Sequence, residues 1–170
     1  MPDSHFILGG ARSGKSRRAL TLAEAKGPRR VFVATAQAWD TEMAERISRH
    51  QDERGLGWST VDAPLALVGA LSDLSHSVDV CVVDCLTLWL SNLILDNRDV
   101  ETETKQLCRS LNTLAIPVIL VSNEVGLGLV PETPLGRTFR DAQGRLNQAV
   151  AAICNRVEFV AAGLPITLKP

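Results

Sequence analysis

The 170-residue chain lacks a long apolar run, a strong net charge and a cysteine pattern typical of metal sites. No stretch approaches the roughly 20 apolar residues of a membrane-spanning helix, so we expect no membrane span. The formal net charge is −1, which favours neither nucleic acid nor an anionic membrane surface as a partner. The four cysteines form no C-x-x-C pair, which argues against a zinc site; they are Cys81, Cys85, Cys108 and Cys154.

Export signals and repeats are also missing. Residues 1–5 carry no basic stretch of the kind that opens a signal peptide, so we expect a cytoplasmic protein with reduced thiols. The sequence contains no internal repeat and no low-complexity segment. Its length suits one domain covering residues 1–170, and contents of 45% hydrophobic and 22% charged residues are ordinary for a globular fold.

What the sequence does contain is a complete phosphate-binding loop, G-x-x-x-x-G-K-[ST]. It follows the apolar run 6–8 and precedes a segment with helical spacing, which is the context that the motif requires. Glycines let successive N–H groups point at phosphate oxygens beside a helix N-terminus. We expect Lys15 to reach the terminal phosphates and the Ser16 hydroxyl to hold Mg²⁺. The predicted nucleotide-binding residues here are Gly9, Gly10, Ala11, Arg12, Ser13, Gly14, Lys15 and Ser16.

Apolar strands alternate with helices along the rest of the chain. The expected strands are 6–8, 31–34, 58–61, 78–84 and 116–122. The expected helices are 16–26, 40–54, 64–74, 99–114 and a long one from Leu135. Segments 157–161 and 166–168 are expected to form a terminal hairpin, and 126–134 a mobile loop. The prediction is an α/β fold, a RecA-like P-loop NTPase, with a mostly parallel sheet, helices on both faces and a C-terminal β-hairpin.

Asp84 closes the apolar strand 80–83, and a hydrophobic strand followed by an acid is the pattern of a Walker B element. Asp84 is therefore a candidate ligand of Mg²⁺, directly or through water, together with Ser16. The alternative is an acid that caps the following segment.

His50 is the second candidate for chemistry. In the expected helix 40–54 it shares one arc with Met43, Arg46, Ile47 and Arg54. A neutral imidazole flanked by guanidinium groups suits a phosphate-bearing substrate and can attack phosphorus to form a phosphoramidate. The alternative is a half-buried histidine beside a solvated arginine stripe. Three further arginines are open to interpretation as anion ligands, subunit contacts or surface salt bridges: Arg137, Arg140 and Arg145.

The phosphate loop by itself does not separate a nucleotide-dependent regulator from an enzyme. A regulatory GTPase would carry an N-K-x-D motif, whereas the corresponding segment reads Ser122-Asn123-Glu124-Val125. A small-molecule kinase of the nucleoside monophosphate or shikimate type would need no nucleophilic histidine. A third alternative is an enzyme that has kept only nucleotidyl transfer.

Further blocks extend the pattern over nearly the whole chain. They read ATA (34–36), DTEM (40–43), RISRHQDER (46–54), WSTVDAP (58–64), VDCLTLWLSNL (83–93), VSNEVGLG (121–128), GRTFRD (136–141), GRLNQ (144–148) and AGLP (162–165). With the phosphate loop, these blocks resemble the bifunctional adenosylcobinamide kinase / adenosylcobinamide-phosphate guanylyltransferase family. The loop is shared by many folds, but the later blocks are specific to this family.

The resemblance implies two reactions in cobalamin biosynthesis. The first phosphorylates the aminopropanol hydroxyl of adenosylcobinamide from ATP or GTP. The second transfers GMP from GTP to that phosphate, giving adenosylcobinamide-GDP and pyrophosphate. It implies that His50 becomes guanylylated, so His50 and Lys15 are the expected catalytic residues, with Mg²⁺ as cofactor.

The resemblance also implies further nucleotide contacts and a homo-oligomer, namely a trimer. The contacts fall on Val33, Ala34, Thr35, Gln51, Asp52, Glu53, Arg54, Asp62 and Asp84. The chain departs from the family at two positions. Asp62 stands where the family usually has glutamate, and Gly55 where it has proline. We expect these departures to affect the nucleotide preference and to leave the reaction class unchanged.

Overall fold

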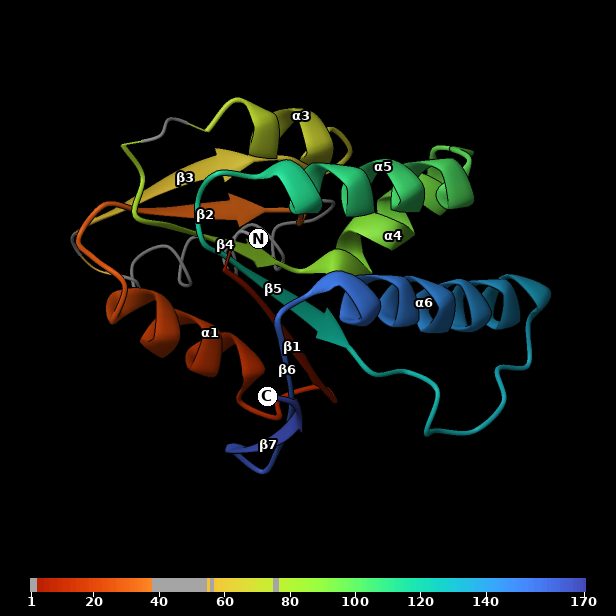
Figure 1. Cartoon of the computed structure of the whole chain (residues 1–170). Coiled ribbons are helices and arrows are strands. Elements are labelled where there is room, and N and C mark those ends of the chain that lie inside the picture. Colours follow the sequence, from red (N-terminus) through yellow and green to blue (C-terminus); the bar gives the residue numbers. More distant parts are fainter. Residues whose placement is uncertain (1–2, 38–54, 56, 75–76) are drawn as a thin grey trace.

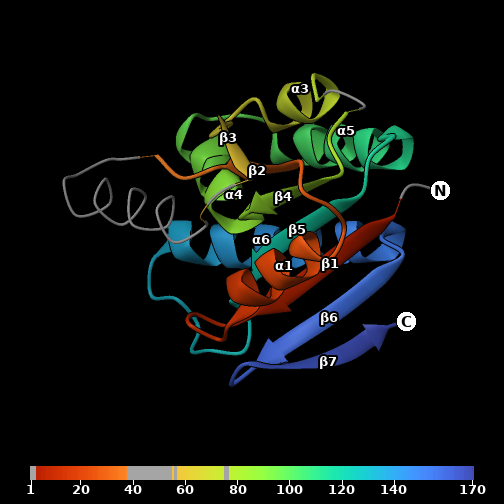
Figure 2. The same cartoon turned by 90° about the vertical axis from the view of Figure 1, so that its left-hand side faces the viewer.

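The computed structural model describes residues 3–37, 55, 57–74 and 77–170, and a seven-stranded sheet forms its centre. The strand order is β3-β2-β4-β5-β1-β6-β7 (Figures 1 and 2). Neighbouring strands run parallel, except for the antiparallel pair β6 and β7. The strands are β1 (Ser4–Gly9), β2 (Arg30–Ala34), β3 (Trp58–Asp62), β4 (Val80–Asp84), β5 (Val118–Asn123), β6 (Arg156–Ala161) and β7 (Leu164–Lys169).

Helices cover both faces of the sheet. On one face lies α1 (Lys15–Glu24), and on the other lie α3 (Leu67–Ser72), α4 (Leu86–Leu95), α5 (Val100–Thr113) and α6 (Pro134–Ile153) (Figure 2). Successive residues of a strand point to opposite faces. In β4, Val80 and Val82 therefore pack in the core beneath α1, whereas Cys81 and Val83 pack beneath the other helices. This double burial explains why the strand is apolar at every position.

The predicted α/β fold and the terminal hairpin are confirmed. The helix expected over 64–74 is wrong in extent, because only Leu67–Ser72 is helical. The helix expected over 40–54 lies outside the described residues. One helix, α4, was not expected at all. Its segment, LTLWLSNLIL, is apolar on nearly every side, so it lacks the polar positions that give an amphipathic helix its period.

Two polar side chains of α4 attach it to the sheet. Asn92 donates through Nδ2 to the carbonyl oxygens of Thr35 at 2.8 Å and Pro64 at 2.9 Å. The Nε1 of Trp89 donates to the carbonyl of Leu65 at 3.0 Å. These bonds tie the helix that follows β4 to the segments that follow β2 and β3, at one edge of the sheet.

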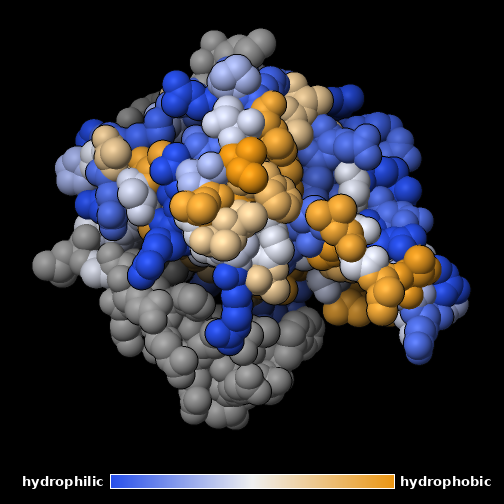
Figure 3. All heavy atoms as spheres, turned by 90° about the horizontal axis from the view of Figure 1, so that it is seen from below, coloured by the Kyte–Doolittle hydropathy of each residue, from blue (hydrophilic) through white to orange (hydrophobic). Residues whose placement is uncertain are grey.

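Two segments of the described chain each carry three exposed large apolar side chains. One is β7, with Leu164, Ile166 and Leu168. The other is the irregular segment between β5 and α6, with Leu127, Leu129 and Val130. Both patches are visible from below in Figure 3. Within the described ranges, no helix is long and apolar enough to cross a membrane.

Candidate active site

The phosphate loop connects Gly9, the last residue of β1, to Lys15, the first residue of α1. Two of its glycines are required by geometry. A Cβ on Gly9 would lie 2.5 Å from the Ser13 Oγ and 2.6 Å from the Val160 carbonyl oxygen. Gly14 has a φ of 98°, a conformation that other residues rarely adopt. The loop thus wraps closely in front of the N-terminus of α1, as phosphate binding requires.

The Lys15 side chain is folded over this loop. Its Nζ donates to the Gly10 carbonyl oxygen at 2.9 Å, and the residue is buried. Burial lowers the pKa of the Lys15 ammonium, while the nearby Asp84 carboxylate partly opposes that shift. The Ser13 Oγ is also buried and has no partner among the described residues. A phosphate in the loop would therefore meet a cation and an unpaired hydroxyl at a helix N-terminus.

Asp84 lies at the same edge of the sheet as the phosphate loop. It pairs with Val121 of β5, which pairs with Ile7 of β1, so Asp84 lies two strand spacings, about 10 Å in all, from Ile7, two residues before Gly9. Asp84 and the Ser16 hydroxyl supply oxygen ligands, which suit Mg²⁺. No group of three or more His, Cys, Asp or Glu in the described part of the chain forms a cage for a metal ion. These residues therefore fit a Mg²⁺ ion that shares its ligands with phosphate oxygens and water.

Three of the predicted nucleotide contacts lie inside the protein. Val33, Ala34 and Thr35 are buried at the end of β2. The Thr35 hydroxyl accepts from the Cys85 N–H at 2.8 Å and donates to the Cys85 carbonyl at 2.7 Å. The Thr35 carbonyl accepts from Asn92. Thr35 therefore supports the turn after Asp84, and its side chain has no free group to offer a nucleotide.

Asp62, in contrast, is exposed at the end of β3. It pairs with Ala34, and Ala34 pairs with Asp84, so the three lie in a row along the same edge. By strand spacing, Asp62 is about 19 Å from Ile7 of β1, the strand that leads into the phosphate loop. A nucleotide that extended along this edge would have its phosphates at one end and Asp62 near the other.

The predicted catalytic histidine and the residues expected around it lie outside the described residues. They are His50, Gln51, Asp52, Glu53 and Arg54, with Met43, Arg46 and Ile47.

The three arginines that the sequence left open to interpretation lie in and after the first turn of α6. Arg137 donates to the carbonyls of Pro131 and Glu132, and Arg140 pairs with Asp141. Arg137 therefore fastens a loop, and the surface salt-bridge interpretation holds for Arg140. Arg145 is exposed.

A buried polar network that the sequence did not suggest lies behind the site. The Ser122 hydroxyl donates to Asn147 Oδ1 at 2.8 Å, and Gln143 Nε2 donates to the same two side chains. The backbone of Asn123 donates to Thr87 Oγ1 at 2.7 Å and accepts from Asn147 Nδ2 at 3.1 Å. The network fixes the end of β5 opposite Gly9. Its only signal in the sequence is polar residues on the buried sides of apolar elements.

The turn of the C-terminal hairpin also contacts the phosphate loop. The Gly163 N–H donates to the Ser13 carbonyl oxygen at 2.8 Å. A Cβ on Gly14 would lie 3.2 Å from the Gly163 Cα. The segment AGLP at 162–165 thus holds the loop from outside the sheet, a contact between residues about 150 positions apart.

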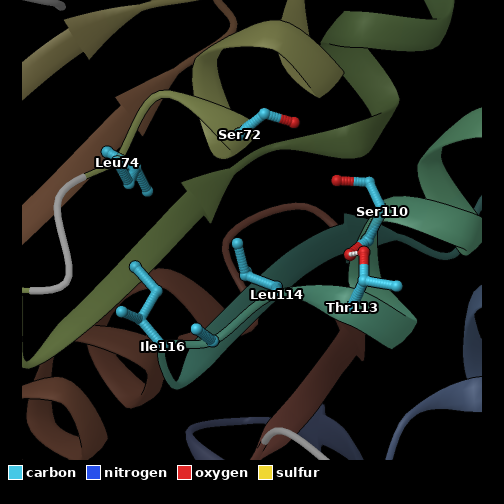
Figure 4. Close-up of a pocket in the computed structure, with 7 residues that line it drawn as sticks. Ser72, Leu74, Ser110, Thr113, Leu114 and Ile116 are labelled. Carbon is cyan, nitrogen blue, oxygen red and sulfur yellow. Dashed lines mark hydrogen bonds between the residues drawn. The ribbon is translucent and has the colours of Figure 1, made fainter.

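A separate hollow lies far from these residues, between the C-terminal ends of α3 and α5 (Figure 4). Ser72, Ser110, Thr113, Leu114 and Ile116 are among its lining residues. The Ser72 and Thr113 hydroxyls bond to carbonyls of their own helices. The residues that line this hollow precede β4 and β5 in the chain, whereas the phosphate loop follows β1. Because these strands are parallel, the hollow lies at the opposite edge of the sheet from the phosphate loop.

The chain is similar to characterised proteins over nearly its full length. A family model described as cobinamide kinase / cobinamide phosphate guanyltransferase matches residues 5–168. The bifunctional adenosylcobalamin biosynthesis protein CobP of Pseudomonas aeruginosa is 48% identical over 166 residues, which cover 96% of each chain. The corresponding protein CobU of Salmonella typhimurium is 34% identical over 179 residues, 96% of this chain and 98% of that one.

Solved structures support the fold. The RadB recombinase has a TM-score of 0.53 at 18% identity, covering 92% of this chain and 73% of that chain. The flagellar accessory protein FlaH from Methanocaldococcus jannaschii has a TM-score of 0.55 at 13% identity, covering 98% and 78%. The phosphate loop, the sheet and the sequence matches together show that the chain is an enzyme of the cobinamide kinase / cobinamide phosphate guanyltransferase family.

Proposed function

We propose that this enzyme catalyses two successive reactions on adenosylcobinamide. It transfers a phosphoryl group from ATP or GTP to the aminopropanol hydroxyl, and then GMP from GTP to the resulting phosphate, releasing pyrophosphate. The observation that carries the proposal is the buried Lys15 ammonium beside Asp84, within a phosphate loop of a chain that belongs to this family. The product is adenosylcobinamide-GDP, an intermediate of cobalamin biosynthesis.

In the first reaction the phosphate loop binds the triphosphate. Backbone N–H groups at the N-terminus of α1 and the Lys15 ammonium neutralise charge on the transferred group. Ser16 and Asp84 would hold Mg²⁺, which withdraws further charge from the phosphate oxygens when bound. The substrate hydroxyl attacks the γ-phosphorus and loses its proton. The bond to the β-phosphate oxygen breaks, and the nucleoside diphosphate leaves.

In the second reaction His50 is the nucleophile. Its neutral imidazole attacks the α-phosphorus of GTP, the bond to the pyrophosphate oxygen breaks, and a histidine–GMP phosphoramidate forms. A phosphate oxygen of adenosylcobinamide phosphate then displaces the imidazole and takes the GMP. Arg46 and Arg54 would bind the departing or incoming phosphate. Gln51, Asp52, Glu53 and Asp62 would position the nucleotide.

The test is incubation with GTP labelled at the α-phosphate, followed by acid or base treatment of the protein. We expect a label that acid removes and base leaves, because a phosphoramidate is acid-labile. His50→Ala should remove the label and GMP transfer while kinase turnover remains, and His76→Ala should retain all three. A His50→Ala protein that still becomes labelled would show that another residue is the nucleophile.

We also infer that the single domain 1–170 assembles as a homotrimer in the cytoplasm. Sedimentation should then give a mass near three times the chain's 18.4 kDa. A monomer at micromolar concentration would contradict this inference without affecting the two reactions.

A further inference from the structure

Exposed apolar side chains border the candidate active site. We define the apolar rim as Leu95, Leu127, Leu129, Val130 and Leu135, whose exposed fractions run from 57% to 96%. They lie at the end of α4, in the loop between β5 and α6, and in the first turn of α6. Leu95 and Leu135 line one hollow, and Leu127, Leu129 and Val130 lie in the loop that leads to it. Exposed apolar patches often mark binding sites.

A hollow of about 300 Å³ continues the rim between α4 and α6. Leu95 and Leu135 belong to both the rim and the hollow, and Phe139 adds an aromatic wall. Ser91 and Thr133 are its polar members. The Thr133 hydroxyl accepts from the Gly136 N–H at 3.1 Å, so its own proton is available to a carbonyl. The hollow is therefore apolar with hydroxyl groups at its margin.

The rim and the phosphate loop share one edge of the sheet. The phosphate loop follows β1, α4 follows β4, and the rim loop follows β5, and these three strands are parallel neighbours (Figure 1). The Glu124 N–H, where the rim loop begins, donates to the Gly9 carbonyl at 3.0 Å. Ser91 lies five residues after Leu86, the first residue of α4, about 7.5 Å along the helix.

Hydrogen bonds at both ends hold the rim loop in its exposed conformation. The Glu124 carboxylate accepts from the N–H groups of Gly126 at 2.6 Å and Leu127 at 3.1 Å. At the other end, Arg137 donates to the carbonyls of Pro131 and Glu132 at 2.9 and 2.7 Å. These bonds hold both ends of the loop, and its leucines are exposed, although exposure of apolar area is unfavourable unless a ligand covers it.

We propose that the apolar rim and its hollow bind the corrin ring of cobinamide. This inference rests on the proposed function, because the occupant is that enzyme's substrate. A corrin is a large, mostly apolar ring with amide side chains, and its acceptor hydroxyl ends an arm of about 9 Å. The ring must therefore bind one arm's length from the phosphate loop. The hollow admits one edge of the ring, Leu127 and Leu129 cover the adjacent face, and Ser91 and Thr133 meet the amides.

The test compares Leu129→Asp with Ile166→Asp, which places the same charge on an equally apolar, exposed position of β7. Cobinamide binding is measured by equilibrium dialysis without nucleotide, and GTP binding and oligomer mass are measured in parallel. We expect Leu129→Asp to raise the Kd for cobinamide at least tenfold, since one buried leucine contributes about that much. Its Kd for GTP should stay within about twofold of the unmodified enzyme, and Ile166→Asp should leave the cobinamide Kd unchanged.

Two outcomes would overturn the inference. One is a cobinamide Kd in Leu129→Asp within twofold of the unmodified enzyme. The other is a lower oligomer mass, which would show that the rim contacts a second copy of the chain. If the unmodified enzyme neither binds nor phosphorylates cobinamide, the proposed function itself fails, and the two failures are thereby distinguished.

Discussion

At the scale of single residues, the buried ammonium of Lys15 is the group most directly tied to triphosphate binding. It bonds to its own loop through the Gly10 carbonyl and interacts with the Asp84 carboxylate. A bound phosphate would offer this cation a stronger, charged partner than a carbonyl.

Lys15→Ala should therefore weaken both reactions, because both use a triphosphate. We expect kcat/KM for each to fall about a hundredfold or more, as when one transition-state donor is removed. The matched control is Arg17→Ala, an exposed cation two residues along α1, which should change little. Kinase rates that stay unchanged in Lys15→Ala would show that the loop has only a structural role.

Substitutions of Thr35 test whether this residue supports the turn at Cys85 or contacts the nucleotide directly. Thr35→Val leaves the buried N–H of Cys85 without its partner, while the Cys85 carbonyl still accepts from the Trp89 N–H, so it should lower the free energy of unfolding by about 1–3 kcal/mol. Thr35→Ser keeps the hydroxyl and should retain most of the stability. Urea denaturation measures both. If Thr35→Val is as stable as the unmodified protein but binds GTP poorly, Thr35 contacts the nucleotide directly.

At the scale of elements, the C-terminal hairpin acts on the phosphate loop through one hydrogen bond, from the Gly163 N–H to the Ser13 carbonyl. Gly163 has a φ of 79°, and a Cβ there would meet no atom within 4 Å. A side chain at position 163 would meet no neighbouring atom, so substitutions there test the backbone conformation and the N–H donor and not the available space.

Gly163→Pro removes the donor and forbids the positive φ, so it should release the loop and raise the Kd for GTP about tenfold. Gly163→Ala keeps the donor and should cost only about 1 kcal/mol of stability, with GTP binding retained. Calorimetric titration and thermal unfolding distinguish the two. Equal GTP affinity in both folded variants would mean that the hairpin does not support the loop.

At the scale of the whole molecule, a partly buried ion pair joins α1 to the sheet. Glu158 of β6 accepts from Arg18 at 2.9 and 2.8 Å, and these bonds hold the pKa of Glu158 below its usual 4.5. Burial lowers the pKa of His5, whose Nε2 lies 3.5 Å from the same carboxylate without a hydrogen bond. His5 is therefore neutral near pH 7 and adds no charge pair of its own.

Both depressed pKa values make the fold less stable in acid. The unfolded chain takes up the His5 proton below about pH 6.5 and the Glu158 proton below about pH 4.5, before the folded chain does. Stability should thus fall in two stages as the pH drops. Glu158→Gln should cost about 1–2 kcal/mol at pH 7 and progressively less below pH 4.5. Urea midpoints across pH 3–8 measure this.

The control for this prediction is Glu101→Gln, which removes an exposed partner of Lys105 and should change stability by less than about 0.5 kcal/mol at any pH. A Glu158→Gln deficit that stays constant from pH 7 to pH 3 would show that packing, and not the charge of Glu158, supplies its stabilisation.

Local patterns in the chain were enough to predict the phosphate loop, most strands and helices and the family, and they made Asp84 a candidate metal ligand. These features are set by neighbours in the chain: glycine spacing, apolar runs and the alternation of strands with helices. Helix α4 was not predicted because apolar residues lie on nearly all its sides, so its sequence lacks the helical period that would distinguish it from a buried strand.

The surroundings of the phosphate loop, in contrast, depend on contacts between distant segments. The Thr35 hydroxyl bonds to Cys85, because the parallel pairing of β2 with β4 brings the two together, and the predicted contact of Thr35 with a nucleotide stays a prediction. Three further features join segments that are distant in the chain. They are the polar network of Ser122, Gln143 and Asn147, the contact of Gly163 with the phosphate loop, and the apolar rim. Sheet order sets which of these segments meet, and sheet order depends on the packing of all strands at once and not on any local pattern.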